Sequence, residues 1–246
     1  MIFSSPIWAP NVIAKFYRLA TCTYAPQIPY AAETYWQLFD TYRDKGVNQP
    51  RVLEIGCGTG FFLETLRQKG IKDVWGVEPG VAMVDQAPEW LRRRIKLGMF
   101  HKGMFTGGRF DVVVSWHTLD HLVDPVMVVK EVKRLLKPGG LVVVVVHDTE
   151  GISIKLWGEK SPIFDIEHVY LFNKQTLREL FMRHKFNVLN LGEVTNSYPP
   201  TYWLRMSGLP AWLKKAGQVA VRWLNLDRLS VPLKAGNISL VARKPG

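Results

Sequence analysis

Residues 52–60 read Val-Leu-Glu-Ile-Gly-Cys-Gly-Thr-Gly, and this stretch decides the fold. An apolar run containing Glu54 leads into Gly56, Gly58 and Gly60, and a helical pattern follows over residues 61–68. Glycine lacks the Cβ that would keep a ligand away from the backbone. A strand, a glycine turn and a helix N-terminus in this order therefore predict a loop that holds a ligand.

The glycine spacing discriminates between ligands. The dinucleotide fingerprint places its third glycine three positions after the second, but Phe61 stands there and the third glycine is Gly60. A nicotinamide or flavin loop is therefore disfavoured, and a nucleotide-dependent oxidoreductase is kept as a rival. Glu78 ends the next apolar run, where a carboxylate can accept hydrogen bonds from both hydroxyls of a ribose.

Apolar runs and helical patterns alternate along the middle of the chain. Short apolar runs at 51–55, 74–78, 95–97, 111–115 and 141–146 are separated by helical patterns at 61–68, 81–91 and 125–136. The five valines at 142–146 are typical of a central strand covered on both faces. A Lys-Pro-Gly-Gly turn at 137–140 is expected to end the preceding helix.

A helix at 174–184 and strands at 186–191 and 237–242 complete the pattern. We therefore predict an α/β fold: a doubly wound, mostly parallel seven-stranded sheet with helices on both faces, an N-terminal helical cover and a C-terminal helical insertion. The 246 residues fit a single domain. Its expected parts are a cover at 1–50 with a helix at 30–44, a cofactor-binding core at 51–192, an acceptor-side helical insertion at 193–235 and a last strand at 236–246.

The composition and the cysteine content are typical of a globular protein in a reducing compartment. Apolar residues make up 47% of the chain and charged residues 22%, as in ordinary globular proteins. Cys22 and Cys57 are the two cysteines, and a disulfide at Cys57 would distort the glycine loop. No apolar stretch is long enough to span a membrane, and residues 1–10 lack the basic start of a signal peptide. We expect a cytoplasmic protein, with a location peripheral to the inner membrane surface as the alternative.

Three stretches together resemble the class I S-adenosylmethionine-dependent methyltransferases. Residues 52–60 are similar to the first motif of that family, residues 110–115 to its fourth strand and residues 135–141 to the turn before its fifth. The resemblance covers roughly residues 50–192 and implies S-adenosylmethionine as the cofactor. It implies that Gly56 and Gly58 line the methionine moiety, Glu54 reaches its amino group, Glu78 binds the ribose and Met83 packs near the adenine.

One family feature is missing from this sequence. A polar residue, commonly aspartate, follows the third strand in the family, but Met99 and Phe100 stand here after Gly98. The resemblance then implies an adenine contact that is apolar or made by backbone. The full set of expected cofactor-binding residues is Glu54, Gly56, Cys57, Gly58, Gly60, Glu78, Pro79, Met83, Met99, Phe100, Ser115, Trp116 and His117.

Histidines follow the strands whose carboxyl ends form the ligand crevice. A hydroxyl acceptor needs a base there, and His117 and His147 are candidates. The resemblance implies His168 as a third candidate, since similar family members have a histidine before an aromatic residue here, on the acceptor side. His121 resembles half of an acid–histidine pair of the family with a structural or cofactor-side role. These side chains lack a compact ligand spacing, so we predict no metal site.

The chain has a net charge of +11. Most of the excess lies in residues 201–246, which contain eight basic residues and one acid. Within them, residues 210–225 place tryptophans and aliphatic residues on one helical face and basic residues on the other. We expect either a cover helix packed on the active site or an interfacial helix that contacts anionic lipid. Nucleic acid is disfavoured as a substrate, because residues 115–118 read Ser-Trp-His-Thr instead of the Asn/Asp-Pro-Pro-aromatic motif of base-methylating enzymes.

These patterns favour a methyltransferase of a small-molecule acceptor, acting on oxygen of a sugar, a lipid-linked compound or a polyketide-like compound. The alternatives are N- or C-methylation of a lipid or quinone-like acceptor at a membrane surface, and a non-catalytic binding protein with this fold. No oligomeric state is predicted.

Overall fold

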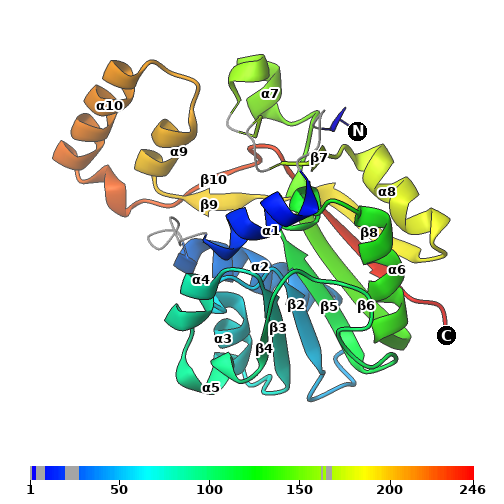
Figure 1. Cartoon of the computed structure of the whole chain (residues 1–246). Helices are drawn as coiled ribbons and strands as arrows, with labels where there is room; N and C mark the ends of the chain where they lie inside the picture. The colour runs from blue at the N-terminus through cyan, green and yellow to red at the C-terminus, as the bar shows by residue number, and fades with distance from the viewer. Residues whose placement is uncertain (1, 4–8, 20–27, 162, 165–167) are drawn as a thin grey trace.

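The valine run at 142–146 lies at the centre of a sheet in the computed structural model of the chain (Figure 1). The structure describes residues 2–3, 9–19, 28–161, 163–164 and 168–246, so Cys22 lies outside the described residues. Within them the main sheet has seven strands, in the order β4 (Ile95–Leu97), β3 (Val74–Glu78), β2 (Val52–Ile55), β5 (Phe110–Trp116), β6 (Leu136–His147), β11 (Asn237–Arg243) and β8 (Asn187–Glu193).

Only one strand of this sheet runs against its neighbours. β11 pairs antiparallel with both β6 and β8, whereas the pairs from β4 to β6 are parallel. The predicted doubly wound, mostly parallel sheet is therefore confirmed. In such a sheet ligands bind at the carboxyl ends of the strands, at the point where the strand order reverses.

Alternating side chains of the central strand belong to two separate cores. Val142, Val144 and Val146 pack into one apolar cluster, and Val143 and Val145 into the other. Successive side chains of a strand point to opposite faces, so an unbroken valine run is required where both faces are covered.

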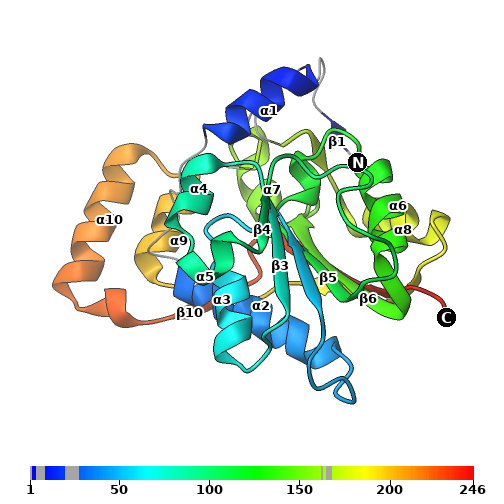
Figure 2. The same cartoon turned by 60° about the horizontal axis from the view of Figure 1, so that its bottom comes forward.

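Helices cover both faces of the sheet (Figures 1 and 2). The side chains of α2 (Ile28–Tyr42) and α3 (Phe61–Gln68) join one core, and those of α6 (Pro125–Leu135) and α8 (Lys174–Arg183) join the other. The N-terminal cover consists of α1 (Pro10–Arg18) and α2, and the Tyr17 hydroxyl of α1 reaches His121. The expected helical cover is therefore present.

The C-terminal insertion lies between β8 and β11. Its elements are β9 (Asn196–Tyr198), α9 (Pro200–Met206), α10 (Ala211–Trp223), the 3-10 turn η4 (Leu226–Arg228) and β10 (Val231–Leu233). β9 and β10 pair antiparallel, and α9 and α10 project from the side of the main sheet in both views (Figures 1 and 2). After β6 the chain forms α7 (Ile152–Trp157), the 3-10 turn η3 (Gly158–Lys160) and β7 (Tyr170–Leu171), which pairs with β1 (Ile2–Phe3).

Two predicted elements differ from the structure. The helix expected at 81–91 is broken into α4 (Val81–Gln86) and α5 (Glu89–Arg92), because Pro88 cannot continue a helix. The turn expected at 137–140 is instead a bulged start of β6: Phe110 pairs with Leu136 and Val112 with Leu141, and Gly139 takes a φ of 74°. The backbone N–H of Gly139 donates to Lys244, so the end of the chain holds this bulge.

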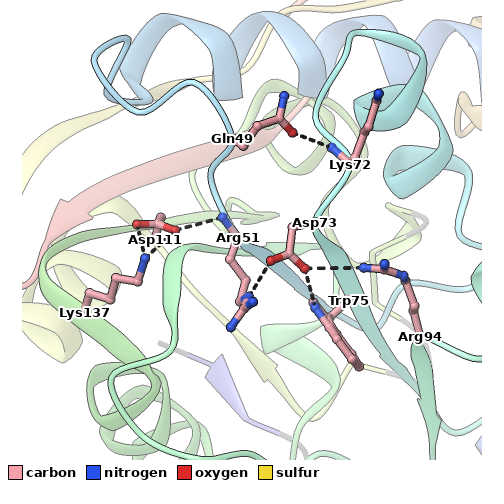
Figure 3. A network of polar contacts seen from close by, with 8 residues as sticks. All are labelled: Gln49, Arg51, Lys72, Asp73, Trp75, Arg94, Asp111 and Lys137. Atoms are coloured by element: carbon pink, nitrogen blue, oxygen red, sulfur yellow. Dashed lines mark hydrogen bonds and ion pairs between the residues drawn. The ribbon is translucent and has the colours of Figure 1, made fainter.

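A polar network ties together the amino ends of the strands, on the edge opposite the ligand crevice (Figure 3). Arg51 and Arg94 pair with Asp73 at 2.6 and 3.4 Å, and Lys137 pairs with Asp111 at 2.8 Å. The Arg51 backbone N–H also donates to Asp111. These contacts fix the strands relative to one another without entering the crevice. No helix among the described residues has the length and apolarity needed to cross a membrane.

Candidate active site

The glycine loop takes a conformation that requires glycine. Gly56, Gly58 and Gly60 have φ values of 75°, 54° and 78°, a region that other residues rarely adopt. A Cβ on Gly56 would lie 2.2 Å from the Thr118 hydroxyl, whereas a Cβ on Gly58 would meet nothing within 4 Å. Gly56 is therefore required by packing, and Gly58 borders open space in which a ligand can lie.

The Glu78 side chain is hydrogen-bonded to the backbone of the glycine loop. Its carboxylate accepts the N–H of Gly58 at one oxygen and the N–H of Gly80 at the other, both at 2.8 Å. Burial raises the pKa of Glu78, and the two N–H donors oppose that rise. The acid expected at the ribose thus lies at the end of β3, against the glycine loop.

Glu54 is almost fully buried, with 1% of its surface exposed, and its Oε2 has no hydrogen-bond partner among the described residues. Burial, with the neighbouring Glu78, raises its pKa well above the usual range. A buried acceptor without a donor is costly. An ammonium group of a bound molecule would satisfy it, and the amino group of S-adenosylmethionine fits this requirement.

The remaining predicted cofactor residues differ in what they offer. The Cys57 thiol is buried in the core, so Cys57 can contribute only its backbone to the loop. The Phe100 ring is 5% exposed within a core cluster, and Met99 packs against that cluster. Pro79, directly after β3, and Met83, in α4, are both partly exposed.

β5 ends with Ser115 and Trp116, and His117 follows it directly. Ser115 Oγ and Trp116 Nε1 are buried without hydrogen-bond partners among the described residues, and the Trp116 ring stacks on Tyr35 at 4.5 Å. His117 has a φ of 49°, a strained value for a residue other than glycine. Burial lowers its pKa to about 3, so its imidazole is neutral at physiological pH.

Four histidines surround one buried carboxylate beside the glycine loop. Asp120, in the 3-10 turn η2 (Leu119–His121), is fully buried, and its Oδ2 lies 2.9 Å from His147 Nδ1. His168 Nε2 lies 3.1 Å from the same His147 nitrogen, and His121 Nε2 lies 3.9 Å from Asp120 Oδ1. We call Asp120, His117, His121, His147 and His168 the imidazole cluster. It unites the three predicted bases, and sequence reasoning did not single out Asp120 as their shared partner.

Asp120 carries the negative charge of the cluster. Burial alone raises the pKa of Asp120, but the hydrogen bond from His147 and the surrounding imidazoles hold it below its usual range. Its Oδ1 has no hydrogen-bond partner among the described residues. The cluster is therefore an ionised, buried carboxylate among imidazoles.

The sequence prediction of no metal site rested on the absence of a compact ligand spacing. Spacing along the chain is not decisive here, because the fold gathers ligand atoms from three loops. Among the described residues, two groups of three donors lie within 4.8 Å of one another: His117, Asp120 and His147, and Asp120, His121 and His168.

An aromatic wall, formed by residues of the N-terminal cover and of the insertion expected on the acceptor side, adjoins the cluster. The Tyr35 ring lies 6.4 Å from the His117 ring, and both Tyr198 and Asp120 raise its pKa electrostatically, after the larger effect of burial. The Tyr198 ring packs on Tyr202 at 4.1 Å and on Trp203 at 5.5 Å. The segment 198–203, with its three aromatic residues and two prolines, was the available signal.

The expectation of a cover helix on the active site is wrong for α10. Its residues, all described, include none that is buried, and it packs on α9 and η4. Gly217 faces Leu204 of α9, whereas Trp212, Val219 and Trp223 are 70%, 62% and 81% exposed. The apolar face of α10 therefore lies open instead of covering the crevice.

The chain belongs to a methyltransferase family. A family model described as a methyltransferase domain matches residues 27–191, which span α2 to β8 and include the whole glycine loop. The fold and this match together define a class I S-adenosylmethionine-dependent methyltransferase, with S-adenosylmethionine as the cofactor of the family. The rival oxidoreductase class is thereby excluded.

Curated relatives share part of the chain. An uncharacterized methyltransferase of Schizosaccharomyces pombe is 35% identical over 131 residues, covering 46% of this chain and 47% of its own. A tRNA U34 carboxymethyltransferase of Idiomarina loihiensis is 28% identical, in an alignment that covers 51% of this chain and 42% of that protein. A ubiquinone biosynthesis O-methyltransferase of Pseudomonas aeruginosa is 35% identical, in an alignment that covers 39% of this chain and 44% of that protein. The match thus spans less than half the length of these relatives.

Among solved structures, a putative methyltransferase of Haloferax volcanii, determined in complex with the Trm112 methyltransferase activator, superimposes with a TM-score of 0.63. It is 20% identical, and the alignment covers 91% of this chain and 95% of the other. This likeness shows the fold.

Proposed function

We propose that the chain transfers a methyl group from S-adenosylmethionine to a hydroxyl of a small, apolar acceptor. The hydrogen bond between His147 and Asp120, beside the glycine loop, carries this proposal. A hydroxyl must lose a proton on methylation, and an imidazole oriented by a buried carboxylate is a base suited to that step.

The cofactor supplies the chemistry: its sulfonium offers an electrophilic methyl group and leaves as a neutral thioether. The chain supplies binding and alignment. Glu54 and the glycine loop hold the methionine end, Glu78 and Pro79 lie toward the ribose, and Met83 and Met99 lie toward the adenine. Alignment of acceptor and methyl group alone can contribute up to about 7 to 11 kcal/mol in favourable systems.

His147 is the base that the contacts favour among the three predicted histidines. Its Nδ1 donates to Asp120, which leaves Nε2 free to accept a proton, and 21% of its side chain is exposed. His117 has a buried Nδ1 without a partner among the described residues, and only 7% of the His168 side chain is exposed. A base must reach the acceptor, so exposure favours His147.

Methyl transfer from tritiated S-adenosylmethionine tests this proposal. Acceptor probes are a prenylated phenol, a polyketide-like phenol, an alkyl glucoside and total tRNA. We expect transfer to a phenol, reduced about 100-fold or more by His147→Asn with unchanged cofactor binding. His184→Asn, outside the cluster, is the control. Transfer to tRNA alone, or full activity in His147→Asn, would contradict the proposal.

The aromatic wall supports an apolar acceptor. Tyr198, Tyr202 and Trp203 of the insertion pack on one another, and Tyr35 lies 6.4 Å from the His117 ring. Aromatic rings bind apolar or planar groups. The ubiquinone biosynthesis O-methyltransferase among the relatives acts, by its name, in the synthesis of such a compound. A lipid-linked or polyketide-like hydroxyl is therefore favoured over a sugar.

We further propose that α10 brings this site to an anionic lipid surface. Trp212, Val219 and Trp223 form its exposed apolar face, and Lys215 and Arg222 are exposed on the same helix. Tryptophans and basic residues on an amphipathic helix are typical of helices that lie in the membrane interface. A lipid-linked acceptor would then be met where it resides.

Flotation with vesicles of phosphatidylcholine, with or without phosphatidylglycerol, tests the lipid contact. We expect binding that needs the anionic lipid and is lost in Trp212→Ser/Trp223→Ser. Met182→Ser/Leu189→Ser removes apolar side chains that are about half exposed elsewhere and should float like the unmodified chain. A dimer in solution that this tryptophan double variant abolishes, without vesicle binding by the unmodified chain, would show that α10 pairs with a second copy instead.

A further inference from the structure

Asp120 is a buried anion whose surroundings leave one oxygen unsatisfied. Its carboxylate is fully buried, its Oδ2 accepts from His147, and its Oδ1 has no hydrogen-bond partner among the described residues. Taking a carboxylate out of water is strongly unfavourable unless a positive charge or donors compensate it. The nearest nitrogen to Oδ1 in an ion-pair contact is His121 Nε2, at 3.9 Å, which is too far for a hydrogen bond.

Two further atoms converge on the same place. One ring nitrogen of His121, one ring nitrogen of His168 and one Asp120 oxygen lie within 4.8 Å of one another. His121 Nδ1 is 2.7 Å from the Tyr17 hydroxyl, so a proton on Nδ1 donated to Tyr17 leaves the lone pair on Nε2, which lies 3.9 Å from Asp120 Oδ1. Metal-binding histidines commonly donate their other ring N–H to an oxygen in this way.

We propose that Asp120, His121 and His168 bind a divalent transition-metal ion of the zinc type. Two imidazoles and one carboxylate are a ligand set for zinc, iron or cobalt and not for magnesium or calcium, which take oxygen ligands. Bonds of about 2.0 to 2.2 Å in a tetrahedral site place ligand atoms about 3.3 Å apart. His121 Nε2 lies 3.9 Å from Asp120 Oδ1 and His168 Nε2 lies 4.0 Å from Asp120 Oδ2, so the three side chains would move closer together on binding the ion.

The ion leaves the predicted base in place. His147 Nδ1 lies close to both Asp120 Oδ2 and His168 Nε2. An ion on His168 would take its lone pair, and His147 would then donate to Asp120 alone. Three protein ligands leave a fourth position, which is the arrangement of catalytic metal sites. This role rests on the proposed function: an acceptor oxygen bound at the fourth position would be oriented beside His147.

Metal binding is tested on the full chain after treatment with EDTA. Calorimetric titration with Zn²⁺ should give one site, and Co²⁺ should give visible absorption bands typical of nitrogen and oxygen ligands. His121→Gln and His168→Gln should each weaken Zn²⁺ binding at least about tenfold and remove the Co²⁺ bands. His184→Gln changes a histidine whose Nδ1 contacts the Leu180 carbonyl, far from the cluster in sequence, and should bind like the unmodified chain.

The outcomes separate this proposal from the proposed function. Absence of stoichiometric binding, or equal binding by the His121 and His168 variants, overturns the metal site even if methyl transfer is observed. Weakening by His184→Gln alone would show an adventitious surface site and overturns it too. Unchanged affinity for S-adenosylmethionine in each variant establishes that the chain is folded. Metal binding without methyl transfer to any probe would refute the proposed function and leave the metal site standing.

Discussion

At the scale of single residues, burial of the Glu54 carboxyl destabilises the folded chain at neutral pH. This carboxyl is buried at 1% exposure beside Glu78, and burial holds its pKa well above the ordinary 4.5. The folded chain therefore keeps a proton that the unfolded chain releases. Stability of the free chain consequently declines as the pH rises above about 4.5 toward the folded-state pKa, and then levels off.

Glu54→Gln tests this balance. We expect a higher urea midpoint than the unmodified chain at pH 7.5 and little difference at pH 4.5, because the amide removes the titration. Cofactor affinity should fall about 10- to 100-fold, since a charged hydrogen bond to the ammonium is lost. Calorimetry and urea titration measure the two effects. Glu89→Gln, exposed on α5, should change neither, and a destabilised Glu54→Gln would contradict the argument.

Two glycines of one loop should fail in different ways. Gly58→Ala puts a Cβ into open space at a φ of 54°, so it should cost about 1 kcal/mol of stability but weaken cofactor binding at least tenfold. Gly56→Ala drives a Cβ against Thr118 and should cost roughly 2 to 4 kcal/mol. Urea unfolding with calorimetry checks both. Normal cofactor affinity in Gly58→Ala would show that no ligand lies beside that residue.

At the scale of elements, the start of α6 positions the imidazole cluster. The Asp124 side chain accepts the N–H of Met127 at 2.8 Å and caps the helix directly after the turn that carries Asp120 and His121. Capping residues determine where a helix begins. A frayed first turn would loosen the two cluster residues that precede it.

Asp124→Ala should lower the free energy of unfolding by about 1 kcal/mol. It should also reduce methyl transfer more than it reduces cofactor affinity, because the glycine loop is untouched. Urea unfolding and the tritium assay provide the measurements. Asp85→Ala, at an exposed position of α4, is the matched control. An equal loss in the control would mean that the cap has no special role.

At the scale of the whole molecule, the buried cores and the exposed helix α10 are separate parts of the chain. The two cores on the faces of the sheet contain the fully buried side chains, whereas α10 has none in the described structure. Phe62→Ala in the core should cost about 3 to 5 kcal/mol. Trp212→Ser/Trp223→Ser should stay within about 0.5 kcal/mol of the unmodified chain.

Cofactor linkage completes this comparison. S-adenosylmethionine at a hundredfold excess over its Kd should stabilise the unmodified chain and the tryptophan double variant alike, by about 2.7 kcal/mol. Urea unfolding with and without cofactor measures it. A double variant that unfolds early, or that loses the cofactor effect, would show that α10 supports the fold after all.

The predictable part of this protein is local in the sequence. The glycine loop, the apolar strands and the valine run were assigned correctly because each depends on residues within about ten positions. Boundaries failed where one residue overrides a pattern, as Pro88 does in the helix predicted at 81–91. At 137–140 the backbone near Lys244 bonds to the expected turn, which is part of a strand. A local sequence pattern carries no information about this distant contact.

The sequence by itself therefore determined the sheet, the glycine loop and the class of protein, because hydrophobic period and glycine spacing act over short distances along the chain. Only the tertiary structure decided that His121, His147 and His168 share one buried carboxylate, since they leave the sheet on separate loops. It also decided that the apolar face of α10 is open, because whether a face is covered depends on what packs against it and not on the helix itself.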